Sequence, residues 1–266
     1  MKTLLVLTML AGWQPLDTPG WLDFVEGSFN EARERAAASN TADGLALACR
    51  SGLVIGGFKE HGSKSVTSLH RALDDCEKAL ALDPNNVVAG VSYAIGIGYE
   101  AKRIRKASYV KASKERLEAL VARLPDDPLA VAAMGGWHSA VSNAGFLARL
   151  ALGASRKEAQ KYFERAIALD DQSVGTRFEY VRFLARGDKE ERALARKELS
   201  VALTIRPKDA AEEIMLKRLA ALMEPLESDD KKAAKNTVIE TSAFDDIAEW
   251  DEIEPYPLKP LKNHSS

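Results

Sequence analysis

The sequence predicts an all-α protein whose helices pair into hairpins that stack one after another. Three observations support this fold. Alanine, leucine, glutamate, lysine and arginine dominate the 266 residues, and all of them favour helix. The dense alternation of valine, isoleucine and threonine that strands would need is missing. Finally, a short pattern of small and large apolar residues occurs three times along the chain.

In the recurring pattern, a small residue, a larger apolar residue and a second small residue stand at positions i, i+4 and i+7. These positions share one face of a helix. Small residues let two helices approach closely while the larger one fills the groove beside them, so each copy predicts the second helix of a hairpin. The three copies are Ala72-x3-Cys76-x2-Ala79, Ala159-x3-Phe163-x2-Ala166 and Ala195-x3-Leu199-x2-Ala202, and each is closed by Pro or Asp.

This pattern is the second-helix half of the tetratricopeptide-repeat (TPR) consensus, and the chain resembles that family here. The first-helix half is only approximated, by Gly90, Tyr93, Gly96 and Gly98. The resemblance implies a TPR-like α-α superhelix of about four helix hairpins plus a capping helix. In such a superhelix the first helices line a concave face that binds a partner.

A narrower resemblance lies in residues 136–170. Gly136-Trp137-His138, Gly153-Ala154-Ser155 and the Ala159 copy of the pattern resemble a group of TPR-like proteins. This group includes the regulators of microtubule dynamics and the periplasmic T component of TRAP transporters. The resemblance implies a non-enzymatic helical scaffold that holds a small ligand or a transporter partner.

Capping residues and breakers divide the chain into helices and three larger segments. Thr41 caps one predicted helix, and Pro128 opens another at its first turn. The predicted helices span 21–38, 41–58, 68–82, 86–106, 112–124, 128–143, 155–169, 173–185, 190–205 and 209–223, with a loop at 62–66. The predicted segments are a signal peptide at 1–18, a helical repeat domain at 19–223 and an acidic, proline-containing tail at 224–266.

The N-terminus has the pattern of a secretory signal peptide. Met1 and Lys2 precede an apolar run from Leu4 to Trp13, which is too short to span a bilayer as a helix. Trp13 stands where a lipoprotein would carry its lipid-bearing cysteine, so lipidation is excluded. We therefore expect a periplasmic or secreted protein with no integral membrane segment. The alternative is that the run is the first packed segment of a cytoplasmic solenoid.

The two cysteines, Cys49 and Cys76, flank a predicted helix-loop-helix centred near Gly62 and Ser63. Antiparallel helices would bring them level, so a disulfide can form if their Cα atoms come within about 7 Å. The alternative is a pair of buried thiols that act as small hydrophobic residues.

The C-terminal tail is acidic. Residues 224–266 carry eleven acids and five bases, and Pro255, Pro257 and Pro260 forbid helix at the end. This composition favours a loosely ordered tail. The alternative is an acidic-aromatic peptide that lies in a partner's groove or in the protein's own, docked on a basic cluster. That cluster comprises Lys102, Arg103, Arg105, Lys106, Lys111, Lys114 and Arg116.

The sequence contains no intact catalytic, metal-binding or cofactor-binding motif. Gly57-x4-Gly62-Ser63-Lys64-Ser65 is a near miss of a phosphate-binding loop, without the preceding strand. The four histidines show no zinc-ligand spacing, and no nucleophile has an evident base. We therefore expect no enzyme, no catalytic residues, no metal and no cofactor. The net charge of −2 gives no reason to expect nucleic acid as a partner.

The expected function is therefore binding of a protein or peptide partner in the concave groove, in the bacterial envelope. One alternative is a module for a small anionic ligand that works with a transporter; a second is an enzyme of unknown type. Tryptophan and tyrosine offer flat amphipathic contact, and arginine can hold a carboxylate. For Trp137 a place in the core is the alternative. The candidate binding residues are Tyr93, Trp137, His138, Asn143, Arg177 and Tyr180.

Overall fold

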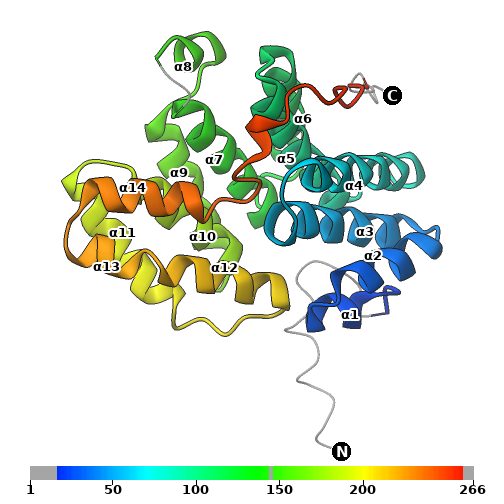
Figure 1. Cartoon of the computed structure of the whole chain (residues 1–266), viewed down its shortest axis with the longest axis horizontal. Helices are drawn as coiled ribbons and strands as arrows, with labels where there is room; N and C mark the ends of the chain where they lie inside the picture. Colours follow the sequence, from blue (N-terminus) through cyan, green and yellow to red (C-terminus); the bar gives the residue numbers. More distant parts are fainter. Residues whose placement is uncertain (1–16, 144–145, 260–266) are drawn as a thin grey trace, which may run out of the picture.

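The computed structural model describes residues 17–143 and 146–259, and the side chains of all of these except 146–148. This part of the chain forms fourteen α-helices and contains no strand. The helices make a curved array (Figure 1). The predicted all-α, solenoid-like fold is confirmed. The predicted signal peptide lies almost wholly outside the described residues.

Four helix hairpins form the body of the array, as the sequence predicts. The two helices of each hairpin pack against one another, and consecutive hairpins pack side by side. The pairs are α3 (Ala42–Val54) with α4 (Ser63–Leu82), α5 (Val87–Ile104) with α6 (Ala107–Arg123), α7 (Pro128–Ser142) with α9 (Arg156–Leu169), and α10 (Val174–Ala185) with α11 (Lys189–Ala202). A short π-helix, η2 (Ile55–Lys59), follows α3, and α8 (Phe146–Leu152) lies between α7 and α9.

Each new hairpin begins at the same kind of cap. Thr41, Asn86, Asp127 and Ser173 have extended backbones, and each side chain accepts a hydrogen bond from the amide three residues later. These bonds satisfy amides that the first helical turn leaves free. The caps therefore fix where the first helix of each hairpin starts.

The small residues of the recurring pattern lie where helices meet. Ala79, Ala166 and Ala202 are all 0% exposed, so none of them faces solvent. A Cβ atom added at Gly135 in α7 would lie 3.1 Å from the ring of Phe163 in α9. The backbones of this hairpin approach closely because one side offers small residues and the other fills the groove.

Several predicted boundaries are wrong; α6, for example, begins at Ala107 and not at 112. The single helix predicted at 21–38 is broken into α1 (Trp21–Glu26) and α2 (Phe29–Ala38), because Gly27 takes φ +88°. The loop predicted at 62–66 is helical from Ser63 onward. Polar residues suggested a loop there, but Ser65 is buried and its hydroxyl donates to the Gly56 carbonyl at 2.7 Å.

The array curves until its first and last parts meet. Helix α12 (Ala210–Ala220) packs against α1, and the two lie side by side in Figure 1. Arg50 in α3 forms an ion pair at 2.8 Å with Asp209, the residue that caps α12. The contact joins residues 159 positions apart and closes the curve.

The acidic tail is packed on the body as far as the structure describes it. It forms α13 (Met223–Glu227), α14 (Lys231–Glu240) and the short 3-10 helix η3 (Ile247–Glu249). We call residues 241–259 the C-terminal strap. The strap runs from α14 across the array toward α6 (Figure 1), and Phe244, Ile247 and Tyr256 are buried. The favoured expectation of a loosely ordered tail is wrong for these residues.

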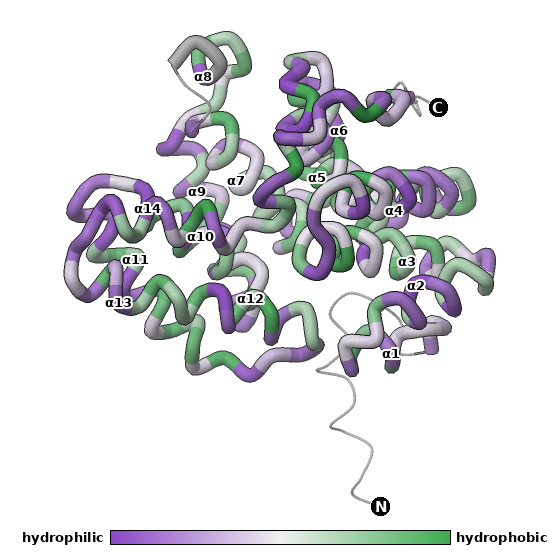
Figure 2. The backbone as a smooth tube through the Cα atoms, in the orientation of Figure 1, coloured by the Kyte–Doolittle hydropathy of each residue, from purple (hydrophilic) through white to green (hydrophobic). Residues whose placement is uncertain are grey.

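Hydropathy explains why the strap docks. Hydrophobic and hydrophilic residues are mixed along its path in Figure 2. Phe244, Ile247 and Tyr256 join the hydrophobic cluster of Leu69 and Leu73 from α4. The overall composition of the tail is polar and so predicts disorder. A few apolar residues at the right positions are nevertheless enough to dock it, and an average composition does not reveal them.

Candidate functional site: the groove beneath the strap

The strap lies in a groove that has α5 as its floor and α4 and α6 as its walls. We call this the strap groove. Polar side chains from all three helices reach the strap. They are His70, Asp74 and Glu77 from α4, Glu100, Lys102 and Arg103 from α5, and Tyr109 and Arg116 from α6.

A buried ion pair lies at the centre of the groove floor. Arg103 donates from Nη2 to Glu100 Oε1 at 2.6 Å and from Nε to Oε2 at 2.8 Å, and both side chains are 0% exposed. Burial alone would raise the pKa of Glu100. Hydrogen bonds from Arg103, His70 and the Tyr256 amide outweigh it and lower the pKa to about 2. Glu100 is therefore an anion at any physiological pH.

The same pair binds the main chain of the strap. Arg103 donates to the carbonyls of Trp250, Ile253 (2.9 Å) and Glu254 (3.4 Å). Glu100 Oε1 accepts the amide of Tyr256 at 2.9 Å. These contacts hold the turn at 251–253 and the main chain after it by groups that every peptide carries, except that proline lacks the amide.

Tyr256 is the side chain held most completely. It is 4% exposed, its hydroxyl donates to Asp74 Oδ1 at 3.1 Å, and its ring lies 5.6 Å from that of His70. Its carbonyl accepts from the Tyr109 hydroxyl at 2.7 Å. Burial and the nearby Glu77 and Asp74 raise the pKa of Tyr256, so the phenol stays neutral. The amide, carbonyl and hydroxyl of this residue are all satisfied by the groove.

A second anchor lies nearer α14. Phe244 packs on Gly56 and Gly57 of η2 and on Tyr99 of α5, and its carbonyl accepts from Lys102 Nζ at 2.7 Å. Its amide donates to the Gly57 carbonyl at 3.1 Å. A side chain at either glycine would meet the Phe244 ring at about 3 Å, so the glycines make room for it.

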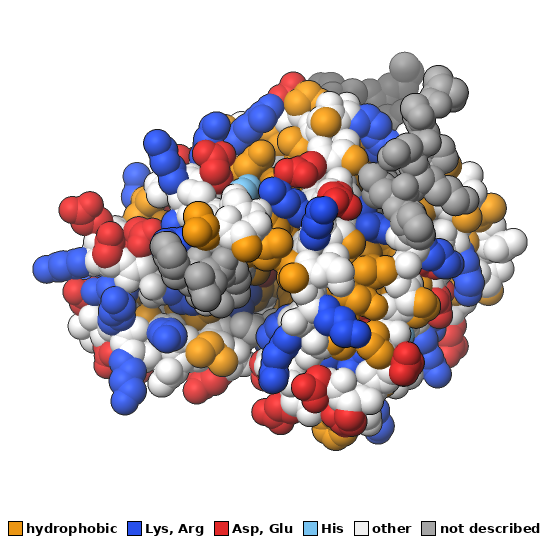
Figure 3. Space-filling view, turned by 90° about the horizontal axis from the view of Figure 1, so that it is seen from above, with side chains coloured by type: hydrophobic (Ala, Val, Ile, Leu, Met, Phe, Trp, Pro, Cys, Tyr) orange, Lys and Arg blue, Asp and Glu red, His pale blue; other side chains and the backbone are white. Residues whose placement is uncertain are grey.

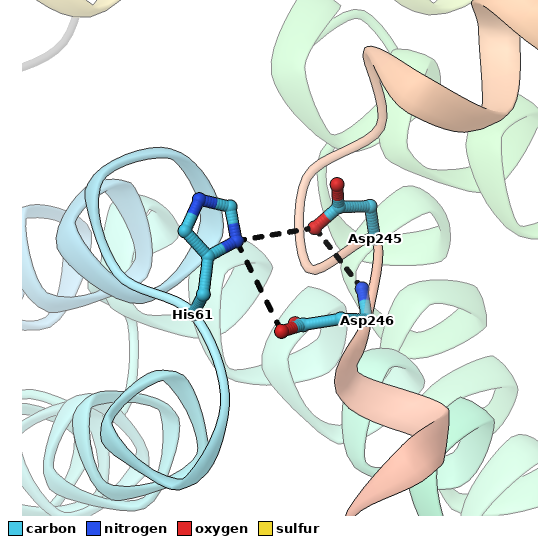
Figure 4. Close-up of side chains that lie close together, drawn as sticks. All are labelled: His61, Asp245 and Asp246. Carbon is cyan, nitrogen blue, oxygen red and sulfur yellow. Dashed lines mark hydrogen bonds and ion pairs between the residues drawn. The ribbon is translucent and has the colours of Figure 1, made fainter.

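His61, Asp245 and Asp246 meet beside this anchor. The His61 Nδ1 atom lies 3.7 Å from Asp245 Oδ1 and 3.9 Å from Asp246 Oδ2, and Figure 4 shows the three side chains turned toward one another. Their ligand atoms lie within 4.8 Å, close enough to share one cation. Asp246 Oδ2 also accepts the Gly62 amide at 2.8 Å. Protonated His61 would therefore fasten the strap by charge, as a metal ion would. Sequence spacing did not find this group, since it joins positions far apart.

Of the predicted binding residues, only Tyr93 lies next to the strap groove. Its hydroxyl donates to Glu77, which also pairs with Lys259 of the strap, and Arg116 lies over its ring. Burial and Glu77 raise the pKa of Tyr93. The Tyr93 hydroxyl is therefore bonded within the body, and Glu77 lies between it and the strap.

Trp137 and His138 form a separate cluster with Tyr162. The Trp137 Nε1 donates to the Val110 carbonyl at 3.1 Å, and the side chain is buried between α6 and α7. The His138 ring stacks on Tyr162, and burial lowers the His138 pKa. The placement of Trp137 matches the core alternative.

Asn143, Arg177 and Tyr180 lie elsewhere, so the structure does not gather the six predicted residues into one site. Asn143 donates from Nδ2 to the Ser139 carbonyl at 2.6 Å. Arg177 pairs with Glu198 and is 6% exposed. The Tyr180 hydroxyl donates to a Glu164 oxygen at 3.2 Å.

Cys49 and Cys76 are joined by a disulfide in the structure. Their Cα atoms lie 5.2 Å apart, and both residues are fully buried between α3 and α4. The bridge therefore ties together the two helices of the first hairpin, one of which walls the strap groove.

The surface is mixed in charge. Figure 3 shows basic and acidic side chains interspersed around hydrophobic ones on the face seen from above. Among the described residues, no helix combines the length and the apolar character needed to cross a bilayer.

A comparison with protein families finds one match that covers most of the fold. The family is described as regulator of microtubule dynamics protein 1-3, and residues 33–227 match it. The chain belongs to this family. The matched part contains α4, α5 and α6, whereas the strap lies beyond it. No individually curated protein matches the chain. The wider likenesses to TPR proteins and to TRAP transporter components stay predictions.

Proposed function

We propose that this protein is a non-catalytic regulatory scaffold that holds an extended segment of a partner protein in the strap groove. The family description supports a regulatory role. One observation carries the proposal: the buried Glu100–Arg103 pair binds main-chain atoms of the strap on both sides of Pro255. In this proposal the residues of the groove bind a segment and catalyse no reaction.

The buried pair determines which groups an occupant of the groove must supply. Arg103 is fully buried, and part of its hydrogen bonding goes to carbonyls of the strap. A buried charge that loses such partners is costly. When the strap leaves, water or the main chain of another segment must replace it, and a peptide that forms the same turn before its proline offers the same carbonyls.

In this proposal the strap competes with the partner from within the same chain. A tethered segment has an effective concentration in the millimolar range, so a free peptide binds poorly while the strap is seated. The partner gains access when the strap is displaced or weakened. The groove is thus regulated by its own C-terminal segment.

We further propose that the protein lies in the bacterial envelope, periplasmic or secreted. Two features support that location: the signal-like run Leu4–Trp13 and the Cys49–Cys76 disulfide, since such bonds persist in oxidising compartments. Cell fractionation with N-terminal sequencing tests it. Recovery of the uncleaved chain, with free thiols, from the cytoplasm would contradict it.

The binding test uses the full chain and a defined probe. A fluorescein-labelled peptide with the sequence of residues 249–259 is titrated with the Tyr256→Ala chain, and anisotropy is recorded. We expect binding in the micromolar range, and binding at least about tenfold weaker to the wild type, whose own strap fills the groove. Tyr162→Ala, which changes a tyrosine of α9 outside the groove, should behave like the wild type.

A further variant ties the binding to the groove. Tyr109→Phe removes the hydroxyl that donates to the Tyr256 carbonyl, and in the Tyr256→Ala chain it should weaken the peptide by roughly two- to tenfold. Circular dichroism checks that the Tyr256→Ala chain is still folded. If the folded chain binds no peptide, the groove only holds the strap in place and the proposal is wrong.

A further inference from the structure

We infer that the strap groove selects an unphosphorylated tyrosine flanked by prolines, with a basic residue three positions later. The inference rests on the proposed function and names the class of partner segment: an extended Pro-Tyr-Pro-x-Lys peptide on another protein. Its template is the part of the strap from Pro255 to Lys259, which reads Pro-Tyr-Pro-Leu-Lys.

The prolines prepare the segment for the groove. Residues 254–259 form neither helix nor strand. Proline fixes its own φ and steers the residue before it to extended backbone, so Glu254 and Tyr256 are both held extended before binding. A segment that is already extended loses little conformational entropy when it docks.

Proline also fits the hydrogen-bond pattern. Of residues 255–257, only Tyr256 has an amide hydrogen, and it donates to Glu100 Oε1. Pro255 and Pro257 bring no amide that would need a partner. A single amide acceptor in the floor therefore suits a segment with proline on both sides of the central residue.

The central position favours tyrosine through Asp74. Its carboxylate accepts the Tyr256 hydroxyl at 3.1 Å. Phenylalanine would fill the same space beside His70 but lose that bond. Because Asp74 is itself exposed and can bind water instead, the preference for tyrosine should be modest.

Charge makes the position reject phosphotyrosine. Asp74 accepts from the hydroxyl, and Glu77 is a second anion close enough to raise the pKa of Tyr256. A phosphate on the same oxygen would add up to two negative charges beside both. The position +3 has the opposite preference, since Lys259 Nζ pairs with Glu77.

The test measures specificity with four peptides of residues 249–259 on the Tyr256→Ala chain. The peptides carry tyrosine, phenylalanine or phosphotyrosine at position 256, or alanine in place of both prolines. We expect phenylalanine to weaken binding about two- to tenfold, and phosphotyrosine more than tenfold. Loss of both prolines should weaken it roughly four- to twentyfold through entropy.

A double-mutant cycle assigns the preference to Asp74. Adding Asp74→Ala, at an exposed position whose change should not unfold the chain, should bring the tyrosine and phenylalanine peptides to about equal affinity. If the Tyr256→Ala chain with Asp74 unchanged binds the tyrosine, phenylalanine and phosphotyrosine peptides equally, the inferred specificity is wrong, although the scaffold function is still supported. No binding of any peptide overturns the scaffold function itself.

Discussion

Glu100 and Arg103 lie one helical turn apart on α5 and form an ion pair. Each also binds main-chain atoms of the strap, about 150 residues further along the chain. The ion pair is fully buried, and the strap packs over it. Covering a charged pair removes water from it, so the cover must supply hydrogen bonds in return, as the strap does with its carbonyls and the Tyr256 amide. The relationship links stability of the body to occupancy of the groove.

Removing the cation should therefore destabilise the whole protein. Arg103→Met leaves Glu100 buried without its main partner, and we expect a loss of about 3–5 kcal/mol in the free energy of unfolding. Urea denaturation measures it, and hydrogen exchange should show faster exchange of the Tyr256 amide. Arg105→Met is the matched control, because Arg105 touches the strap from an exposed position and should cost less than about 1 kcal/mol.

Glu100 should make the stability of the protein depend on pH in a defined direction. The pKa of Glu100 is lowered from 4.5 to about 2 in the fold, so its stabilising effect is complete above about pH 5 and is lost as pH falls toward 2. The shift corresponds to about 3 kcal/mol. Glu100→Gln should be less stable than the wild type at pH 7 and should lose less stability between pH 5 and 2.

Chemical denaturation at a series of pH values measures that difference. Glu252→Gln, an exposed acid of the strap, should follow the wild-type pH profile. A wild-type profile in Glu100→Gln would mean that the acid titrates normally and that the pair does not hold the strap.

Reduction of the disulfide should loosen the first hairpin. Cys49 and Cys76 enclose a loop of 27 residues, and a cross-link of that length stabilises a fold by about 3.5 kcal/mol through the unfolded chain. We expect the melting temperature to fall when the protein is unfolded in dithiothreitol. The Cys49→Ala/Cys76→Ala chain, which has no thiols, should melt at the same temperature with and without reductant.

The hairpins were predictable because their signal is local. Alanines at helical spacing on one face, with a stop directly after, fix a second helix without knowledge of its partner. The place of the strap was not predictable in the same way. Its overall composition is that of a disordered tail, and the docking depends on Phe244 and Tyr256 meeting helices far away in sequence.

Two of the predicted binding residues connect neighbouring hairpins. Tyr93 and Tyr180 lie on first helices as predicted, and each donates to a glutamate 16 residues earlier, Glu77 and Glu164. Repeated geometry thus explains them as links between neighbouring hairpins. Glu100 was missed because a buried acid is recognisable only once its partners are known. The basic residues between Lys102 and Arg116 were the available signal, and Lys102, Arg103, Arg105 and Arg116 do contact the strap.

The close approach of helices within a hairpin can be tested at Ala166. This residue is 0% exposed on α9, next to the turn in which Phe163 lies against Gly135 of α7. A leucine there has no space, so Ala166→Leu should destabilise the fold by about 1–3 kcal/mol through overpacking. Ala168→Leu, two residues along the same helix but exposed, should change stability by less than about 0.5 kcal/mol. Equal effects of the two substitutions in urea denaturation would show that the small residue is not what lets these helices pack.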